Sequence, residues 1–258
     1  MAGIPWNRDE TLAAFNFYCR TPFGKLHARN PDIIALAQSL ERIPSAVAMK
    51  CCNIASLDPN QQARGIKGLQ KTSRLDAEIW NEFASTPEQV GYDSELAFSR
   101  FTKTSLRVSR SVEWENIQGL DKQVVTKVRV NQHLFRSIIL AGYRFQCAVC
   151  GLPIQRLLVA SHIVPWSADK SVRMNPCNGL CLCALHDRAF DTGVLAITPD
   201  YQVLIDPDAS KLVASQAVER FLVAYSGKRI ALPDRWLPDP QLLTRHMQIF
   251  DGSIPGCS

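Results

Sequence analysis

The chain has 258 residues, of which 46% are hydrophobic and 21% are charged, a composition that fits a folded protein and excludes wholesale disorder. No apolar run reaches the about 18 residues that a membrane-spanning helix needs, and the start of the chain lacks the apolar core of a signal peptide. We therefore expect a cytoplasmic protein. The net charge of +5 is mild and does not by itself indicate a nucleic-acid partner.

Residues 7–57 predict three helices. The first covers Asn7–Cys19, where apolar residues recur at helical spacing. The second follows Asn30, a capping residue, and begins with a proline at the first helical position; it runs to about Glu41. The third runs from Ser45 to just before Asp58.

The second and third helices are separated by the short break Arg42-Ile43-Pro44, an arrangement that resembles a helix-turn-helix. A plain three-helix bundle explains the same pattern. If the third helix reads DNA, Arg42 and Lys50 should contact phosphates or bases. The sequence leaves both interpretations open for the region 1–83.

Residues 84–125 carry mixed signals and predict a connector with room for one helix. Basic residues follow one another in two stretches, which indicate either solvated faces or phosphate contacts: Arg64, Lys67, Lys71 and Arg74, then Arg100, Lys103, Arg107 and Arg110. A further helix is expected from Lys127 to Tyr143. In the tail, 211–258, we expect a helix with Val218, Phe221 and Leu222 inward and a short helix near Leu242–Phe250. His246 could approach DNA, but a packing or surface role is favoured.

Nine cysteines without a secretion signal argue against a disulfide framework and in favour of metal binding. Cys147 and Cys150 form a CxxC pair on a turn with glycine and proline, and Cys183 and His186 form a CxxH pair about thirty residues later. Two such pairs offer four ligands to a tetrahedral structural zinc ion.

Cys177 and Cys181 are alternative ligands. Cys181 and Cys183 lie two residues apart in a short extended run and share a face, so spacing alone does not choose between them. The CxxH pairing favours Cys183.

An apolar strand lies between the two pairs and ends at His162, just before a proline stops it. Asn178 follows sixteen positions after His162, and Asp187 nine positions after Asn178. The stretches Ser161-His-Ile-Val-Pro and Asn178-Gly-Leu-Cys-Leu-Cys-Ala-Leu-His-Asp-Arg-Ala-Phe-Asp191 resemble the HNH endonucleases, which have a ββα-metal core. The resemblance spans Val128–Asp206.

The resemblance implies a role for each matching residue. His162 is the general base that activates water, Asn178 braces the loop and orients the histidine, and Asp187 binds the catalytic Mg²⁺ or Mn²⁺. His186 falls on a zinc-knuckle position and is therefore a zinc ligand. Ser161 stands where the family commonly has a second metal ligand, and serine is a poor one; Asp191 either assists or caps the helix.

The expected fold is α+β: a helical N-terminal domain (1–83), a connector (84–125), a zinc-stapled ββα nuclease module (126–210) and a helical C-terminal tail (211–258). The expected function is metal-dependent hydrolysis of phosphodiester bonds in double-stranded DNA, of restriction or phage-defence type. The alternative is a zinc-stabilised DNA-binding protein with a decayed nuclease centre. A homodimer would suit a centre that cuts one strand at a time. Gln132 and Arg136, on the helix before the first CxxC, are further expected DNA contacts.

Overall fold

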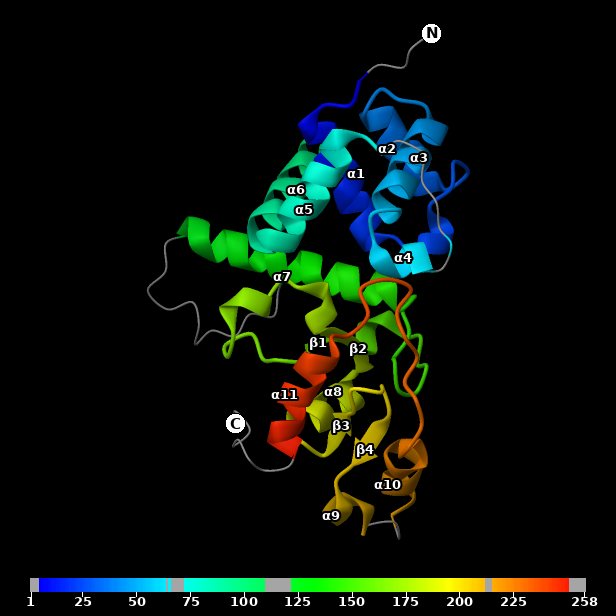
Figure 1. The fold of residues 1–258 in the computed structure, drawn as a ribbon, viewed down its shortest axis with the longest axis vertical. Coiled ribbons are helices and arrows are strands. Elements are labelled where there is room, and N and C mark those ends of the chain that lie inside the picture. Colours follow the sequence, from blue (N-terminus) through cyan, green and yellow to red (C-terminus); the bar gives the residue numbers. More distant parts are fainter. Residues whose placement is uncertain (1–4, 64, 66–71, 110–121, 212–214, 251–258) are drawn as a thin grey trace. The chain divides into compact units, whose positions relative to one another are not determined.

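The computed structural model describes residues 5–63, 65, 72–109, 122–211 and 215–250. The chain divides into two compact units. The helical unit comprises Met1–Gly142 and Asp234–Trp236, and the α+β unit comprises Tyr143–Pro233 and Leu237–Ser258. The helices and strands of each are labelled in Figure 1.

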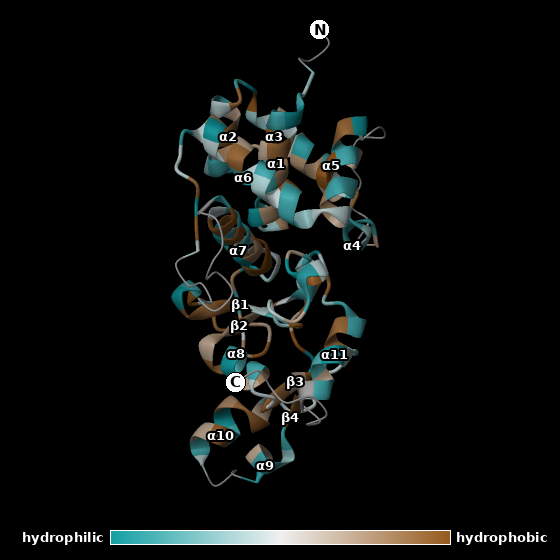
Figure 2. Ribbon diagram, turned by 90° about the vertical axis from the view of Figure 1, so that its left-hand side faces the viewer, coloured by the Kyte–Doolittle hydropathy of each residue, from teal (hydrophilic) through white to brown (hydrophobic). Residues whose placement is uncertain are grey.

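The helical unit is organised around α1, which packs against α3, α5, α6 and α7. Apolar and polar residues alternate along its helices (Figure 2), and its core includes the fully buried rings of Phe15 and Tyr18. Its helices are α1 Arg8–Arg20, α2 Pro31–Ser39, α3 Pro44–Ala55, α4 Pro59–Ala63, α5 Arg74–Ser85, α6 Pro87–Thr102 and α7 Lys122–Gly142. A 3₁₀ turn, Phe23–Lys25, follows α1.

The three predicted N-terminal helices are confirmed, and capping explains where two of them begin. The Asn7 side chain accepts a hydrogen bond from the backbone of Glu10, whose carboxylate accepts one from the backbone of Asn7. The Asn30 side chain caps α2 by accepting a hydrogen bond from the backbone N–H of Asp32, and Pro31 occupies the first helical position.

The predicted connector at 84–125 contains α6, a sixteen-residue helix that packs along α1. Pro87 reads as a break in the sequence, but it stands at the first helical position, where its missing N–H costs no bond. The predicted boundaries at 83 and 125 therefore fall inside the helical unit, and α7 belongs to this unit and not to the α+β unit. Arg64, Lys67, Lys71 and Arg110 lie outside the described residues.

Helices α2 and α3 are joined by a short turn, as expected, but α3 does not present a charged face. Lys50 is 3% exposed, and its Nζ lies 2.7 Å from Asp76 Oδ1. Arg42 lies 2.8 Å from Glu10 and stacks over Trp6. The prediction that Arg42 and Lys50 contact DNA is corrected, because both side chains form ion pairs with carboxylates of the same unit. The packing favours the plain bundle.

The α+β unit contains two small antiparallel hairpins. In the first, β1 (Leu158–His162) pairs with β2 (Gly179–Cys183), and helix α8 (Ala184–Asp191) follows and packs against both strands. The second joins β3 (Leu195–Ile197) to β4 (Val203–Ile205). The remaining helices are α9 Pro207–Ser210, α10 Gln216–Phe221 and α11 Pro240–Phe250. The 3₁₀ turns are Gln155–Leu157, Lys170–Val172, Pro176–Asn178 and Val223–Tyr225.

The α+β class is therefore confirmed, with differences in the tail. Helix α10 is short, and Phe221 is 49% exposed and not inward. The packing role of His246 is confirmed: its ring stacks on Phe190 with centroids 3.5 Å apart, and its Nε2 donates to the Phe190 carbonyl at 3.0 Å. Among the described helices, none combines the length and apolar character needed to cross a membrane.

Candidate metal centre and catalytic loop

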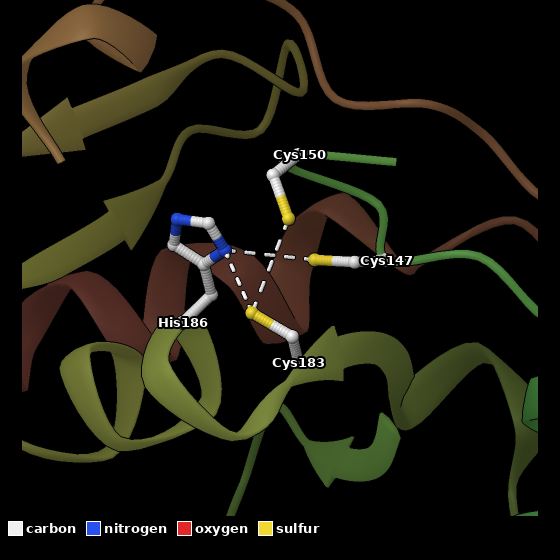
Figure 3. Close-up of side chains that lie close together, drawn as sticks. All are labelled: Cys147, Cys150, Cys183 and His186. Carbon is white, nitrogen blue, oxygen red and sulfur yellow. Dashed lines mark hydrogen bonds between the residues drawn. The ribbon is translucent and has the colours of Figure 1, made fainter. Parts of the chain in front are cut away.

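The four predicted zinc ligands converge in the α+β unit (Figure 3). The ligand atoms of Cys147, Cys150, Cys183 and His186 all lie within 4.8 Å of one another. His186 Nδ1 lies 3.2 Å from the sulfur of Cys183 and 3.6 Å from that of Cys147. Three sulfurs and one imidazole nitrogen are the donor set of a tetrahedral structural zinc site, so the cluster could hold zinc.

Local backbone geometry explains this convergence. The Gly151 N–H donates to the Cys147 carbonyl at 2.9 Å, and Gly151 has a φ of +72°, which closes the CxxC turn. The Ala148 N–H donates to the carbonyl of Cys181 on β2 at 2.7 Å, which ties the turn to the hairpin. Cys183 is the last residue of β2, and His186 lies in the first turn of α8.

The His186 ring is oriented by contacts outside the cluster. Its Nε2 lies 2.9 Å from the Phe221 carbonyl oxygen, and Tyr225 contacts the ring edge-on at 5.4 Å between centroids. Because a carbonyl only accepts, Nε2 carries the proton and Nδ1 keeps a lone pair directed at the sulfurs. A hydrogen bond from the Cys183 thiol lowers the pKa of Cys147, which favours a thiolate there.

The alternative ligands Cys177 and Cys181 are not in the cluster. Cys181 is fully buried within β2, opposite Ala160, whereas Cys183 stands at the strand end, where α8 begins. Cys177 belongs to the 3₁₀ turn that precedes β2. Of the three cysteines, Cys183 is therefore the one that lies in the cluster, as the CxxH pairing predicts.

His162 lies at the far end of the hairpin from the cluster. It pairs with Gly179, while Leu158 pairs with Cys183, so four residues of strand, roughly 13 Å, separate the two positions. Its Nε2 lies 3.1 Å from the Arg173 carbonyl oxygen. This contact requires the proton on Nε2 and leaves the lone pair on Nδ1. Burial lowers the pKa of His162 to about 4, so the ring is neutral at pH 7.

The fully buried Asn178 braces the loop that joins β1 to β2. Its Oδ1 accepts from the Val164 N–H at 2.8 Å, and its Nδ2 donates to the carbonyls of Val164 at 3.1 Å and Val172 at 3.3 Å. Its own carbonyl accepts from Ile163 at 2.9 Å. One side chain thus ties together the two limbs of the loop that follows His162.

Asp187 and Ser161 differ in their suitability as metal ligands. Asp187 is half-buried in the first turn of α8, directly after His186. Ser161 is 3% exposed, and strand alternation turns it to the opposite face of β1 from His162. This placement argues against Ser161 as a ligand beside His162. In the described ranges of the chain, the Cys/His cluster is the one place where three or more His, Cys, Asp or Glu side chains bring ligand atoms together.

Gln132 and Arg136, the other expected DNA contacts, lie on α7 in the helical unit, and both are half-buried. Sequence reasoning missed the site partners Trp166, Arg173 and Phe221. None belongs to a ligand pair or stands at a diagnostic spacing, so no local signal marks them.

A family model for HNH endonucleases matches residues 147–198. The match includes the CxxC turn, the β1–β2 hairpin, α8 and β3, and it is shorter than the expected span of Val128–Asp206. A search of the curated proteins found no match.

Proposed function

We propose that the chain is a metal-dependent endonuclease that hydrolyses DNA phosphodiester bonds, from the premise that residues 147–198 match the family model for HNH endonucleases. The observation that carries the proposal is the environment of His162. Its Nε2 is held by a carbonyl, which leaves Nδ1 as the atom that takes a proton from water.

The neutral imidazole suits this role. Burial keeps the pKa of His162 at about 4, so the ring does not require deprotonation before each turnover at pH 7. An anionic phosphate beside the ring would favour its protonated form and raise the pKa toward the operating pH, which strengthens the base when substrate is bound. Asn178 keeps the following loop in place while this occurs.

We assign the Cys/His cluster to a structural zinc ion. Four protein ligands close the coordination sphere and leave no position for substrate. The cluster also stands at the opposite end of the hairpin from His162. Its role is therefore to hold the CxxC turn, the hairpin and α8 together.

We assign the catalytic Mg²⁺ or Mn²⁺ to Asp187. Mg²⁺ is usually bound by one or two carboxylates, with waters and substrate phosphates completing its coordination, and a single half-buried aspartate fits that donor set. A cation bound there would stabilise negative charge on the nonbridging and leaving oxygens. The protein's own part is to present the carboxylate from the first turn of α8.

The test is a plasmid-nicking assay with and without magnesium or manganese. We expect His162→Ala to reduce cleavage by roughly a hundredfold or more while DNA binding and metal content are retained. Asp187→Ala should also reduce cleavage, with partial recovery at high metal concentration. His27→Ala, which removes an exposed histidine of the helical unit, is the matched control and should cleave normally. Wild-type nicking by His162→Ala would contradict the assignment.

The second candidate is a zinc-stabilised DNA-binding protein whose nuclease centre has decayed. It is favoured by the placement of Ser161, which leaves Asp187 as the one ligand that we assign to the catalytic cation. This candidate predicts DNA binding with no nicking in either metal.

We further propose a restriction or phage-defence role, which cleavage of genomic DNA from methylating and non-methylating hosts would test. Sedimentation would test the proposed homodimer.

A further inference from the structure

We propose that Arg173 is a positioning residue for His162, and that it acts through the ring of Trp166 and through its own main-chain carbonyl. This inference rests on the proposed function, because it concerns the orientation of the proposed general base. All three residues lie on β1 or in the loop between β1 and β2.

The Arg173 side chain closes this loop on Trp166. Its Nε donates to the Trp166 carbonyl at 2.6 Å, and its guanidinium carbon lies 5.2 Å from the centroid of the Trp166 ring. Trp166 is 7% exposed, so the contact forms against a buried ring. One side chain thus fixes both the backbone and the ring of a residue seven positions earlier.

The Trp166 ring in turn contacts His162. The two ring centroids are 5.4 Å apart and the planes are inclined at 80°, an edge-to-face arrangement. The same imidazole also donates a hydrogen bond from its Nε2 to the main-chain carbonyl of Arg173, at 3.1 Å. Arg173 therefore touches His162 directly through its carbonyl and indirectly through Trp166.

The guanidinium contacts matter because Asn178 alone holds this part of the loop weakly. The Asn178 side chain reaches the carbonyl of Val172, next to Arg173, at 3.3 Å, close to the long limit for such a bond. The 2.6 Å bond from Arg173 to the Trp166 carbonyl is shorter than this bond and than the 3.1 Å bond that the Asn175 N–H donates to the same Val172 carbonyl. Loss of the side chain should release the Arg173 carbonyl and the Trp166 ring together, and the imidazole orientation with them.

Single-turnover and steady-state nicking in magnesium test the proposal. We expect Arg173→Ala to lower kcat by about ten- to a hundredfold with KM changed less than about twofold, since a small displacement of a catalytic group has effects of this order. Arg173→Lys should show the same defect, because lysine lacks the planar fork and the Nε–H. Trp166→Ala combined with Arg173→Ala should be no worse than either single change, because both remove one clamp. Lys170→Ala removes an exposed cation from the same loop and should leave kcat unchanged.

Nitrogen-15 NMR of the histidines gives a readout that does not depend on cleavage, with His162 identified by comparison with His162→Ala. The wild type should show His162 with its proton on Nε2 alone. In Arg173→Ala the signal should move toward a mixture of the two tautomers, while zinc content and the other histidines stay unchanged. A variant that loses zinc has unfolded, and Arg173→Lys then supplies the measurement.

Several results would overturn the proposal. Full recovery of kcat by Arg173→Lys, or an increase in KM alone, would make Arg173 a DNA contact that acts through its charge. An unchanged tautomer with an unchanged kcat in Arg173→Ala would remove the link to His162. If the wild type does not nick DNA in either metal, the proposed function fails, and the NMR measurement still decides whether Arg173 orients the imidazole.

Discussion

The helical unit and the α+β unit are stabilised by different means. In the helical unit, long helices surround α1 and bury aromatic and aliphatic side chains such as Phe15, Tyr18 and Ile54. In the α+β unit, the hairpins have strands of five and three residues, which are too small to be stable alone. There, a cluster of three cysteines and a histidine joins the CxxC turn to the hairpin and α8.

The difference shows where buried polar groups stabilise and where they serve chemistry. In the helical unit, the buried cation Lys50 is paired with the buried carboxylate of Asp76, and the pair stabilises the interior of the unit. In the α+β unit, buried or half-buried polar groups form the Cys/His cluster that we assign to zinc, or hold the loop around His162. Stability of the α+β unit should therefore depend on metal, whereas stability of the helical unit should depend on packing and charge pairing.

The largest expected effect comes from breaking the metal cluster. Cys150→Ser should release zinc and unfold the α+β unit, because a closed zinc site contributes on the order of 10 kcal/mol to folding. The helical unit has its own core and should keep its helices. Elemental analysis measures the zinc content, circular dichroism measures the helices that remain, and limited proteolysis shows whether the α+β unit has unfolded.

Cys177→Ser is the matched control, since Cys177 is a half-buried cysteine of the same unit that lies outside the cluster. It should retain zinc and fold. Zinc-free wild-type protein with a fully folded α+β unit would show that the stability of this unit does not depend on metal.

The next effect concerns the ion pair inside the helical unit. Lys50→Met should destabilise the unit by about 3–5 kcal/mol, because it leaves the carboxylate of Asp76 buried without its partner. Adding Asp76→Asn removes the remaining charge and should recover part of that loss. Chemical denaturation followed by helical circular dichroism gives the free energy of unfolding.

Arg74→Ala breaks an ion pair of the same unit that is exposed, with side-chain exposures of 93% for Arg74 and 44% for Glu78. It should change stability by less than about 1 kcal/mol. Equal effects of Lys50→Met and Arg74→Ala would mean that burial of the Lys50–Asp76 pair has no energetic consequence.

The third effect is a pH dependence in the α+β unit. Burial lowers the pKa of His246 to about 4, below the value of about 6.5 in an unfolded chain. Between these values the unfolded state binds the extra proton, so the contribution is complete above pH 6.5 and is lost as the pH falls toward 4. His246→Phe keeps a ring on Phe190 and removes this titration, which should reduce the pH-dependent loss of stability by about 3 kcal/mol.

The measurement is the difference between variant and wild-type unfolding free energies from pH 7 to pH 4, in which the pH dependence of zinc binding cancels. The exposed His27, changed to Ala, should give no difference. Parallel curves for His246→Phe and the wild type would show that His246 titrates normally.

Features that depend on neighbouring residues could be predicted from the sequence. The caps Asn7 and Asn30 act within three residues of themselves, and the helices that follow them begin where expected. The CxxC and CxxH pairs are likewise local, because a tight turn and the first turn of a helix each bring two ligands to one side. Family resemblance then identified His162, Asn178 and Asp187 as the candidate catalytic residues.

Contacts between distant segments were decided by the tertiary structure alone. Lys50 lies on a helix that looked suited to DNA, but its partner Asp76 is 26 residues away. Phe221, which orients His186, is 35 residues from it, and its exposed ring gives no sign that its carbonyl is the functional atom. Arg173 likewise contacts His162 directly through a main-chain carbonyl, which every residue has. Side-chain type therefore carries no information about such contacts, and only the folded chain determines which carbonyl lies beside which ring.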